Sequence, residues 1–448
     1  MHNIPTNILA LIFVLSVLIV IHEGGHFALA KLFKFPVEVF SLGFGKRLFG
    51  FKRKETDYRV SLIPLGGYVK VVGLGPDESD IVAGHTAEPA QPGSRFQRLL
   101  ILFAGPVMNL FLAFALLAGA LALGVRVPRH LYERPVVKHV ESGSPAQKAG
   151  IQVDDEVVKL SGTPVSTWRE VEETLALGSR QDIAVEVRRA GQPVSLTIRP
   201  MPLTKEHERY DIGDTGLSPY LAPIIGNLVP GYPGQKAGLK VGDKIVAVEG
   251  QPVTDYWEVV RRIREISSTF PADAPRPINM VVEREGKSVP FSITPRREEG
   301  WKIGFTPRYE WVPRRLSLGE AAKASVQENV RMAKTTFGIV GRLFSGRGSM
   351  RQLSGPIDIA KFSGEAARSG ASELLTLMAM LSLQLGILNL LPIPLLDGGQ
   401  IAVTLLETIA RRDFSLKVKE RLLQVGFVFL VLVMAAVLAL DVLKNFGL

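Results

Sequence analysis

Two histidines and a glutamate stand close together near the start of the chain, in the sequence His22-Glu23-Gly24-Gly25-His26. On a helix, residues i and i+4 share one face, so His22 and His26 can direct imidazole nitrogens at one metal ion. Glu23 lies beside them, where its carboxylate can act as a general base on water at that metal. The pattern predicts a hydrolytic zinc site with His22 and His26 as ligands and Glu23 as the catalytic base.

This motif interrupts an apolar stretch of the chain. Residues 8–21 are apolar except for Ser16, and the apolar run resumes after His26. At about 1.5 Å per residue, the segment 8–33 is long enough to cross a bilayer as a helix. A charged group at membrane depth costs roughly 2–3 kcal/mol or more. The motif therefore needs a compensating partner, which a metal ion supplies, and a chance match is the less favoured interpretation.

A catalytic zinc site has three protein ligands and one open position. The chain has no cysteine, so its ligands must be histidines or carboxylates. Asp397 follows a long apolar segment in the sequence 392–399 (PIPLLDGG), where two prolines interrupt the helix and two glycines permit a tight turn. Irregular backbone at membrane depth must be buried in protein or line a cavity. Asp397 is the predicted third ligand; alternatively, it caps a helix that starts near Gln400.

The elements that must position these residues are membrane spans. The 448-residue chain is 46% hydrophobic, and four segments are long and apolar enough to cross a bilayer, namely 8–33, 99–125, 374–396 and 422–440. Residues 31–59 carry eight basic side chains against three acidic ones, and 411–421 carry five basic ones. By the positive-inside rule both loops are cytoplasmic. The termini and residues 126–373 then lie outside, with the metal motif nearer the cytoplasmic end of its span.

The net charge of +10 also raises the question of nucleic acid. The basic residues concentrate beside the apolar spans, which favours a lipid bilayer as the partner and no nucleic acid. No lysine or arginine precedes Lys31, so we expect no cleaved signal peptide with a basic start.

The first basic loop is predicted to contain a β-ribbon. Residues 59–63 alternate between polar and apolar, and 66–72 follow a Gly-Gly break. The apolar face of this ribbon either enters the membrane beside the metal site or forms an ordinary hairpin on the membrane surface. Residues 76–94 are predicted to be a flexible linker in which His85 is solvated.

The long outer segment contains a repeat. Residues 144–150 (SPAQKAG) recur as 232–238 (YPGQKAG), 88 residues later, and three further positions keep this offset: Asp155 with Asp243, Gly162 with Gly250, and Pro164 with Pro252. Each copy is predicted to contain a strand, a turn, a strand, a helix and two more strands. The turn before Asp155 is expected to differ between the copies, because Asp154 stands where the second copy has Gly242.

The repeated pattern resembles the PDZ domain in its bacterial protease-associated form. That resemblance implies a groove at a sheet edge, which binds an extended peptide or a C-terminal carboxylate by strand addition. The alternative is that both copies are spacers without a ligand. After them, Ser317 and Glu320 form a capping box for a helix with one apolar stripe that runs from Val326 to Phe344. This helix is predicted to lie on the outer membrane surface or against the second copy.

Several motifs taken together resemble one family. H-E-x-x-H in the first span, N-x-x-P-x-P-x-L-D-G-G at 389–399, the PDZ-like copies and G-F-G at 43–45 are similar to the site-2 protease family of intramembrane zinc metalloproteases, in its bacterial regulator-of-sigma-E branch. Residues 105–109 (GPVMN) also match the pattern of the second span in that family. The resemblance covers essentially the whole chain.

The resemblance implies a role for each matching residue. His22, His26 and Asp397 would bind one Zn²⁺ per chain, with Glu23 as general base, and Asn389 would contact the substrate backbone or polarise the scissile carbonyl. Residues beside the substrate path would be Gly43, Phe44, Gly45, Gly66, Gly67 and Tyr68. The PDZ copies would form a size filter. The implied substrate is a single-span anti-sigma factor already trimmed outside a bacterial inner membrane, and remnant signal peptides are a second implied substrate.

The predicted fold is therefore a polytopic α-helical membrane protein (four transmembrane helices) with two tandem PDZ-like α/β domains and a membrane-associated β-ribbon. The predicted segments are 1–34 with the first span, 35–98 as a cytoplasmic loop with the ribbon, 99–125 as the second span, 126–215 and 216–300 as the PDZ-like domains, 301–373 as an amphipathic helix and linker on the outer face, 374–410 with the third span, and 411–448 with a basic loop and the fourth span.

Two other functions use some of the same features. A membrane carrier of metals or ions also places histidines and carboxylates inside spans, but it does not need Glu23 or peptide-binding domains. Such carriers usually contain inverted repeats, and the spans show none. A PDZ scaffold or inactive homologue does not need an intact Glu23 either. Replacing Glu23 with Gln separates these functions from proteolysis.

Overall fold

The computed structural model describes residues 4–72, 74, 93–203, 211–271, 274–297, 301–345, 350 and 353–446. The linker predicted at 76–94, with His85, lies outside the described residues apart from its last two positions. The chain divides into two compact units, and each is described separately. One unit comprises residues 1–125 and 314–448, and the other comprises 126–313.

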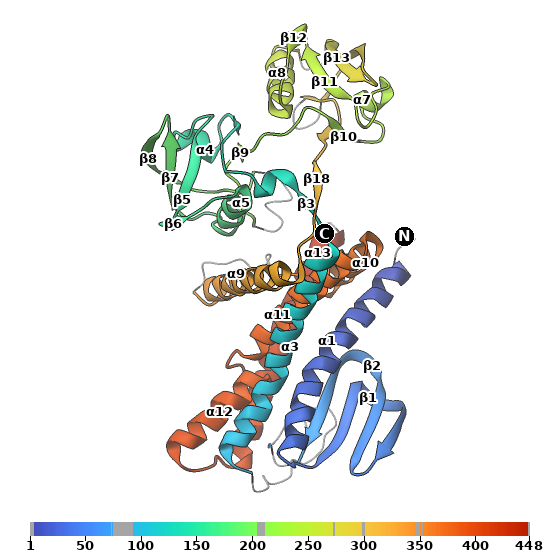
Figure 1. The fold of residues 1–448 in the computed structure, drawn as a ribbon, viewed down its shortest axis with the longest axis vertical. Coiled ribbons are helices and arrows are strands. Elements are labelled where there is room, and N and C mark those ends of the chain that lie inside the picture. The colour runs from blue at the N-terminus through green and yellow to red at the C-terminus, as the bar shows by residue number, and fades with distance from the viewer. Residues whose placement is uncertain are drawn as a thin grey trace. The chain divides into compact units, whose positions relative to one another are not determined.

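Long apolar helices build the first unit. The described residues contain four helices that are long and apolar enough to cross a membrane, which confirms the four predicted spans: α1 (Ile4–Leu32), α3 (Arg95–Leu123), α11 (Ala371–Asn389) and α13 (Leu416–Phe446). Helices α1, α3 and α11 run side by side (Figure 1). The fourth helix extends beyond the predicted 422–440 at both ends.

Glycines bring these helices into close contact. A Cβ atom on Gly25 of α1 would lie 2.5 Å from the carbonyl oxygen of Ala104 on α3. On α11, a Cβ atom on Gly386 would lie 3.0 Å from the carbonyl oxygen of Pro106. Small residues at such crossings let helix backbones approach closely, which is how membrane helices pack without a hydrophobic driving force.

The third span ends in an irregular segment. Helix α11 stops at Asn389, and α12 (Asp397–Ala410) begins eight residues later. The segment between them contains Pro392 and Pro394, as the prolines predicted. Helix α13 lies against this segment so closely that a Cβ atom on Gly426 would be 2.1 Å from the carbonyl oxygen of Pro394.

The predicted ribbon is present as β1 (Val37–Arg53) and β2 (Thr56–Val71), which pair antiparallel. Val39 pairs with both Asp57 and Lys70, so the first half of β1 lies between the two halves of β2. The second half of β1 pairs with the first half of β2. Residues 67–71 therefore form an edge of the ribbon. A shared apolar cluster that includes Ala30 and Val71 packs the ribbon against α1.

Helix α9 (Leu318–Phe344) begins with the predicted capping box. It packs against α3 and α11, a contact that the sequence did not predict, and the Ser325 hydroxyl donates to the carbonyl oxygen of Phe114 at 2.8 Å. Val326, Val330 and Phe337 of the predicted apolar stripe remain about half exposed. In the predicted linker, residues 356–369 form helix α10 (Pro356–Ser369), whose first amides donate to Asp441 of α13.

The second unit contains the two copies of the repeat, and both fold alike. The first copy has the sheet order β6-β5-β7-β8, and the second has β12-β11-β13-β14. The first copy consists of β4 (His139–Val140), α4 (Pro145–Lys148), β5 (Glu156–Leu160), β6 (Thr163–Pro164), α5 (Trp168–Leu177), β7 (Ile183–Arg189) and β8 (Gln192–Ile198). The second consists of β10 (Ile225–Leu228), α7 (Pro233–Lys236), β11 (Lys244–Val248), β12 (Gln251–Pro252), α8 (Tyr256–Ser268), β13 (Ile278–Arg284) and β14 (Lys287–Ile293).

Short strands complete the second unit. Strand β9 (Leu217–Ser218) pairs with β4, and β15 (Arg296–Arg297) pairs with β16 (Trp301–Lys302). Strand β17 (Phe305–Pro307) pairs with β10, so the sheet contacts of the second copy continue beyond residue 300. Strand β3 (Val125–Pro128), where the chain enters this unit, pairs with β18 (Trp311–Arg314), where the chain leaves it. A short 3-10 helix, Arg129–Tyr132, follows β3.

The turn that was expected to differ between the copies is the same in both. Asp154 has φ +70° and Gly242 has φ +96°, so Asp154 adopts the left-handed conformation that glycine favours. Asp155 and Asp243, the next residues, are both 1% exposed, and each carboxylate lies 2.7 Å from an arginine, Arg189 or Arg284. The repeat thus preserves a buried ion pair as well as a backbone path.

Candidate metal centre

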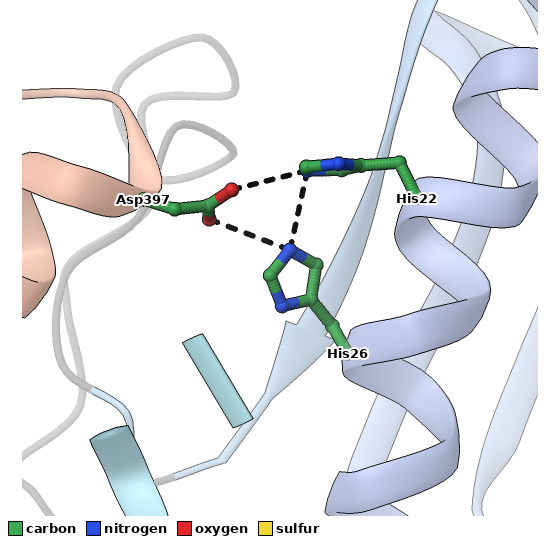
Figure 2. A group of neighbouring side chains, drawn as sticks. All are labelled: His22, His26 and Asp397. Atoms are coloured by element: carbon green, nitrogen blue, oxygen red, sulfur yellow. Dashed lines mark hydrogen bonds and ion pairs between the residues drawn. The ribbon is translucent and has the colours of Figure 1, made fainter. Parts of the chain in front are cut away.

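Three ligand atoms converge where α1 meets the start of α12. Nε2 of His22 lies 3.1 Å from Oδ2 of Asp397, and Nε2 of His26 lies 3.4 Å from Oδ1 of the same carboxylate. The two Nε2 atoms are 3.3 Å apart. Figure 2 shows both imidazole rings extending from one helix face toward the carboxylate on the facing segment. The i, i+4 spacing of His22 and His26 therefore places both imidazoles on one helix face, as predicted.

This geometry fits a tetrahedral metal ion. Zinc–ligand bonds of about 2.0–2.1 Å, arranged tetrahedrally, place neighbouring ligand atoms about 3.3 Å apart. The three observed separations lie close to that value. His22 and His26 are 7% and 8% exposed, and the two carboxylate oxygens of Asp397 face their Nε2 atoms. A buried acceptor facing two imidazole nitrogens is costly by itself, and a cation offsets that cost.

Asp397 reaches the histidines because of where α12 begins. Leu396 is the N-cap residue and Asp397 is the first residue of the helix. The alternative in which Asp397 caps a helix near Gln400 is therefore wrong, since the helix starts earlier and the carboxylate points at His22 and His26. An acidic residue in a first helical turn also interacts favourably with the helix dipole.

The second nitrogen of each histidine is held by α3. Nδ1 of His26 lies 2.8 Å from the carbonyl oxygen of Ile101, and Nδ1 of His22 lies 3.1 Å from Nδ2 of Asn109. Asn389, the last residue of α11, places its Nδ2 3.3 Å from Nε2 of His22. Residues from three membrane-crossing helices thus surround the converging ligand atoms.

A cavity of about 250 Å³ opens beside these atoms. Glu23 and Asn389 line it together with the metal-binding candidates. Four of the predicted residues beside the substrate path also line it, namely Phe44, Gly66, Gly67 and Tyr68. Gly67 stands on the ribbon edge, and a Cβ atom there would lie 3.5 Å from Cγ of Glu23.

Gly43 and Gly45 are not among the residues that line this cavity. They shape the ribbon instead, with φ of +94° and +84°. A Cβ atom on Gly43 would lie 2.7 Å from the carbonyl oxygen of Ile63, so only glycine fits there.

Sequence reasoning missed part of the site. Gln400 lines the cavity one turn after Asp397, and the i, i+3 spacing on a predicted helix was the signal that could have identified it. The apolar walls were also missed; they are Ile19, Val69, Val71, Leu74, Leu102, Leu385 and Leu395. Nothing in their type or spacing distinguishes them from other apolar residues of the spans, the ribbon and the irregular segment after α11.

Membrane-crossing helices, a buried His-His-Asp cluster and a neighbouring glutamate fit a metallohydrolase centre inside a membrane protein. Comparison with known proteins agrees. Residues 10–433 match the model of peptidase family M50, so the chain belongs to that family. It is 31% identical to a Neisseria meningitidis protein whose name describes it as a zinc metalloprotease, over 98% of this chain and 100% of the relative.

Two further relatives carry a more specific name. The chain is 32% identical to the regulator of sigma-E protease RseP of Salmonella typhimurium, over 98% of this chain and 99% of the relative. It is also 32% identical to the RseP of Escherichia coli, over 97% and 98%. The resemblance to the site-2 protease family is confirmed, and the protein is a zinc-dependent metalloprotease of the membrane.

Proposed function

We propose that the protein cuts a peptide bond within or near the transmembrane segment of a single-span membrane protein. The observation that carries this proposal is the convergence of His22, His26 and Asp397 at one cavity among membrane-crossing helices, with Glu23 beside them. We assign these three residues as the ligands of one zinc ion per chain. Glu23 is the general base.

Zinc held by His22, His26 and Asp397 would supply Lewis-acid chemistry for the scissile carbonyl and would lower the pKa of the attacking water toward about 7. Glu23 takes the proton of the attacking water and passes it to the leaving amine. The Asn389 amide, which already lies beside His22, donates a hydrogen bond to the oxygen on which negative charge develops.

The ribbon edge supplies a place for an extended substrate. A transmembrane helix must unwind before its backbone can be attacked, which exposes unpaired N–H and C=O groups. Residues 67–71 form an edge of the ribbon, and Gly67, Tyr68 and Val69 line the cavity. Strand addition to this edge pairs the unwound backbone and presents it to Glu23. Weak helix formers near the cut bond lower the cost of unwinding.

The proposed setting follows from the loops and the repeat. The protein lies in a bacterial inner membrane with the metal centre toward the cytoplasm, because the basic loops beside α1 and before α13 favour that side. The two copies of the repeat are PDZ-like domains in the periplasm. They act as a size filter that admits an anti-sigma-factor-like substrate, or a remnant signal peptide, only after its outer part has been removed.

The decisive experiment uses purified full-length protein and a tagged single-span substrate without its outer domain. Wild type and Glu23→Gln are compared in lipid vesicles, and the product ends are mapped by mass spectrometry. A cut inside the apolar span of the substrate, absent with Glu23→Gln, is expected. If both proteins cut equally, Glu23 is not the base. If neither cuts while both bind zinc and peptide, the scaffold function gains support.

The size filter has a separate test. The unit 126–313 begins and ends with the paired strands β3 and β18, so a short linker can replace it. A folded domain added to the outer end of the substrate should prevent cutting by wild type. The variant with the linker should cut trimmed and bulky substrates alike. Equal cutting of both substrates by wild type contradicts a filter.

A further inference from the structure

Asn109 is a buried polar residue on an otherwise apolar helix, and its side chain touches a proposed metal ligand. It is 0% exposed, and its Nδ2 atom lies 3.1 Å from Nδ1 of His22. Its Oδ1 atom is buried and has no hydrogen-bond partner within the described part of the chain. Such a residue costs free energy in a membrane helix unless its contacts compensate that cost.

The chemistry of the imidazole decides which amide atom faces His22. A neutral imidazole carries one proton, so a histidine that offers the Nε2 lone pair to a metal has its proton on Nδ1. That N–H group needs an acceptor. An N–H of the Asn109 amide cannot accept, whereas its Oδ1 atom can. The two ends of an amide exchange places by rotation about χ2, and their assignment follows from the hydrogen-bond network.

His26 provides the matching case within the same site. Its Nδ1 faces the carbonyl oxygen of Ile101 at 2.8 Å, and a carbonyl can only accept. The proton of His26 is therefore on Nδ1, which leaves Nε2 for the metal. Ile101 and Asn109 are both on α3, so one helix would supply an acceptor for each histidine, from the backbone for His26 and from a side chain for His22.

We infer that Asn109 is a positioning residue whose amide oxygen accepts from Nδ1–H of His22 and thereby presents Nε2 of His22 to the metal. This inference rests on the proposed function, in which His22 is a zinc ligand. Partners of this kind fix the tautomer and the ring orientation of metal-binding histidines.

The test measures zinc affinity in the full-length protein in detergent, by competition with a chelating dye after the metal has been removed. Asn109→Leu removes the acceptor at similar size and should weaken zinc binding about 10–100-fold. Asn109→Asp keeps an acceptor oxygen and should retain wild-type affinity. The control is Ser382→Ala, because the Ser382 hydroxyl is equally buried and donates to the backbone oxygen of Asn109 at 2.8 Å. Its affinity should match wild type.

Thermal unfolding without zinc separates loss of the acceptor from misfolding. Without zinc, Asn109→Leu should unfold near the unfolding temperature of metal-free wild type. Added zinc should raise the unfolding temperature of Asn109→Leu much less than that of wild type. Wild-type affinity in Asn109→Leu overturns the inference, and so does an Asn109→Asp variant as weak as Asn109→Leu. If His22→Ala binds zinc as tightly as wild type, the assignment of His22 fails, and the proposed metal site fails with it.

Discussion

Gly105 of α3 lies directly against the imidazole ring of His26 on α1. A Cβ atom on Gly105 would be 2.2 Å from Nε2 of His26, far closer than any real contact of that kind. The ring therefore occupies the space that a side chain at position 105 would fill. The absence of a side chain at Gly105 on α3 thus determines where Nε2 of His26 on α1 can lie.

Gly105→Ala should consequently displace His26 and weaken zinc binding tenfold or more. Overpacking of a well-packed interior costs about 1–3 kcal/mol, which corresponds to that change if the strain falls on the bound geometry. Zinc titration of the purified protein measures it. Gly119→Ala on the same helix is the control, because the nearest described atom, Cδ1 of Leu375, would be 4.0 Å from the new Cβ. Equal affinity of the two variants would contradict this account.

Glu23→Gln and Asp397→Ala should fail in different ways. Glu23→Gln removes the base and should lower the cleavage rate about 10²–10⁴-fold while zinc content stays at one ion per chain. Asp397→Ala removes a ligand and should lose the zinc itself. Elemental analysis and a cleavage assay on the same preparations distinguish the two. A Glu23→Gln protein without zinc would show that Glu23 belongs to the ligand set.

Gly67→Ala tests the ribbon edge. The new Cβ would lie 2.7 Å from Cγ2 of Ile19 and 2.8 Å from the carbonyl oxygen of Ser41, so the edge must move away from α1. We expect kcat/KM for a transmembrane substrate to fall about tenfold or more, because small misplacements in a site are costly. Zinc affinity should not change. Lys52→Ala, at the opposite edge of the ribbon, should cleave as wild type; an equal loss there would implicate the whole ribbon.

The ion pair of Asp243 and Arg284 should make the second copy sensitive to acid. Burial alone would raise the pKa of Asp243, but the hydrogen bonds from Arg284 and from the Lys240 amide outweigh it and lower this pKa below its ordinary value. The unfolded carboxyl binds protons more readily, so the pair stabilises the fold above about pH 4. That contribution disappears as the pH falls through the lowered pKa.

Arg284→Ala should lower the free energy of unfolding at pH 7, and this loss should shrink as the pH falls below about 4. All four tryptophans of the chain lie between residues 126 and 313. Urea unfolding followed by tryptophan fluorescence therefore reports on this unit within the intact protein. Arg276→Ala, at an exposed arginine, is the control. A pH-independent loss for Arg284→Ala would mean that packing, and not charge, explains the contact.

The spans and the metal motif were predictable because their signals are local. Apolar length defines a span, and the i, i+4 spacing of His22 and His26 defines a shared helix face. The role of Asp397 was also accessible, since a carboxylate on broken backbone at membrane depth needs a partner. The sequence alone left its alternative as a helix cap open. The helix start at Asp397 excludes the cap, and the carboxylate lies against His22 and His26, while its role as a ligand stays a proposal.

Other features depended on contacts between distant segments. The half-exposed stripe of α9 was visible in the periodicity, but its packing against α3 and α11 was not. Helix α10 was missed because its N-terminus is capped by Asp441 from the far end of the chain and not by a neighbouring side chain. The contact between Asn109 and His22 joins two spans, and the match of residues 105–109 to the family pattern did not indicate that partner.

The contact between Gly426 and Pro394 links α13 to the segment beside the candidate metal centre, which the composition of α13 does not reveal. This helix supplies none of the three converging ligand atoms, yet its backbone touches the segment that carries Asp397. A lateral shift of α13 must either move that segment or open a gap beside it. With Asp397 as the proposed third ligand, this contact connects the lipids around the fourth span mechanically to the metal centre, so metal affinity is expected to vary with bilayer thickness and lateral pressure.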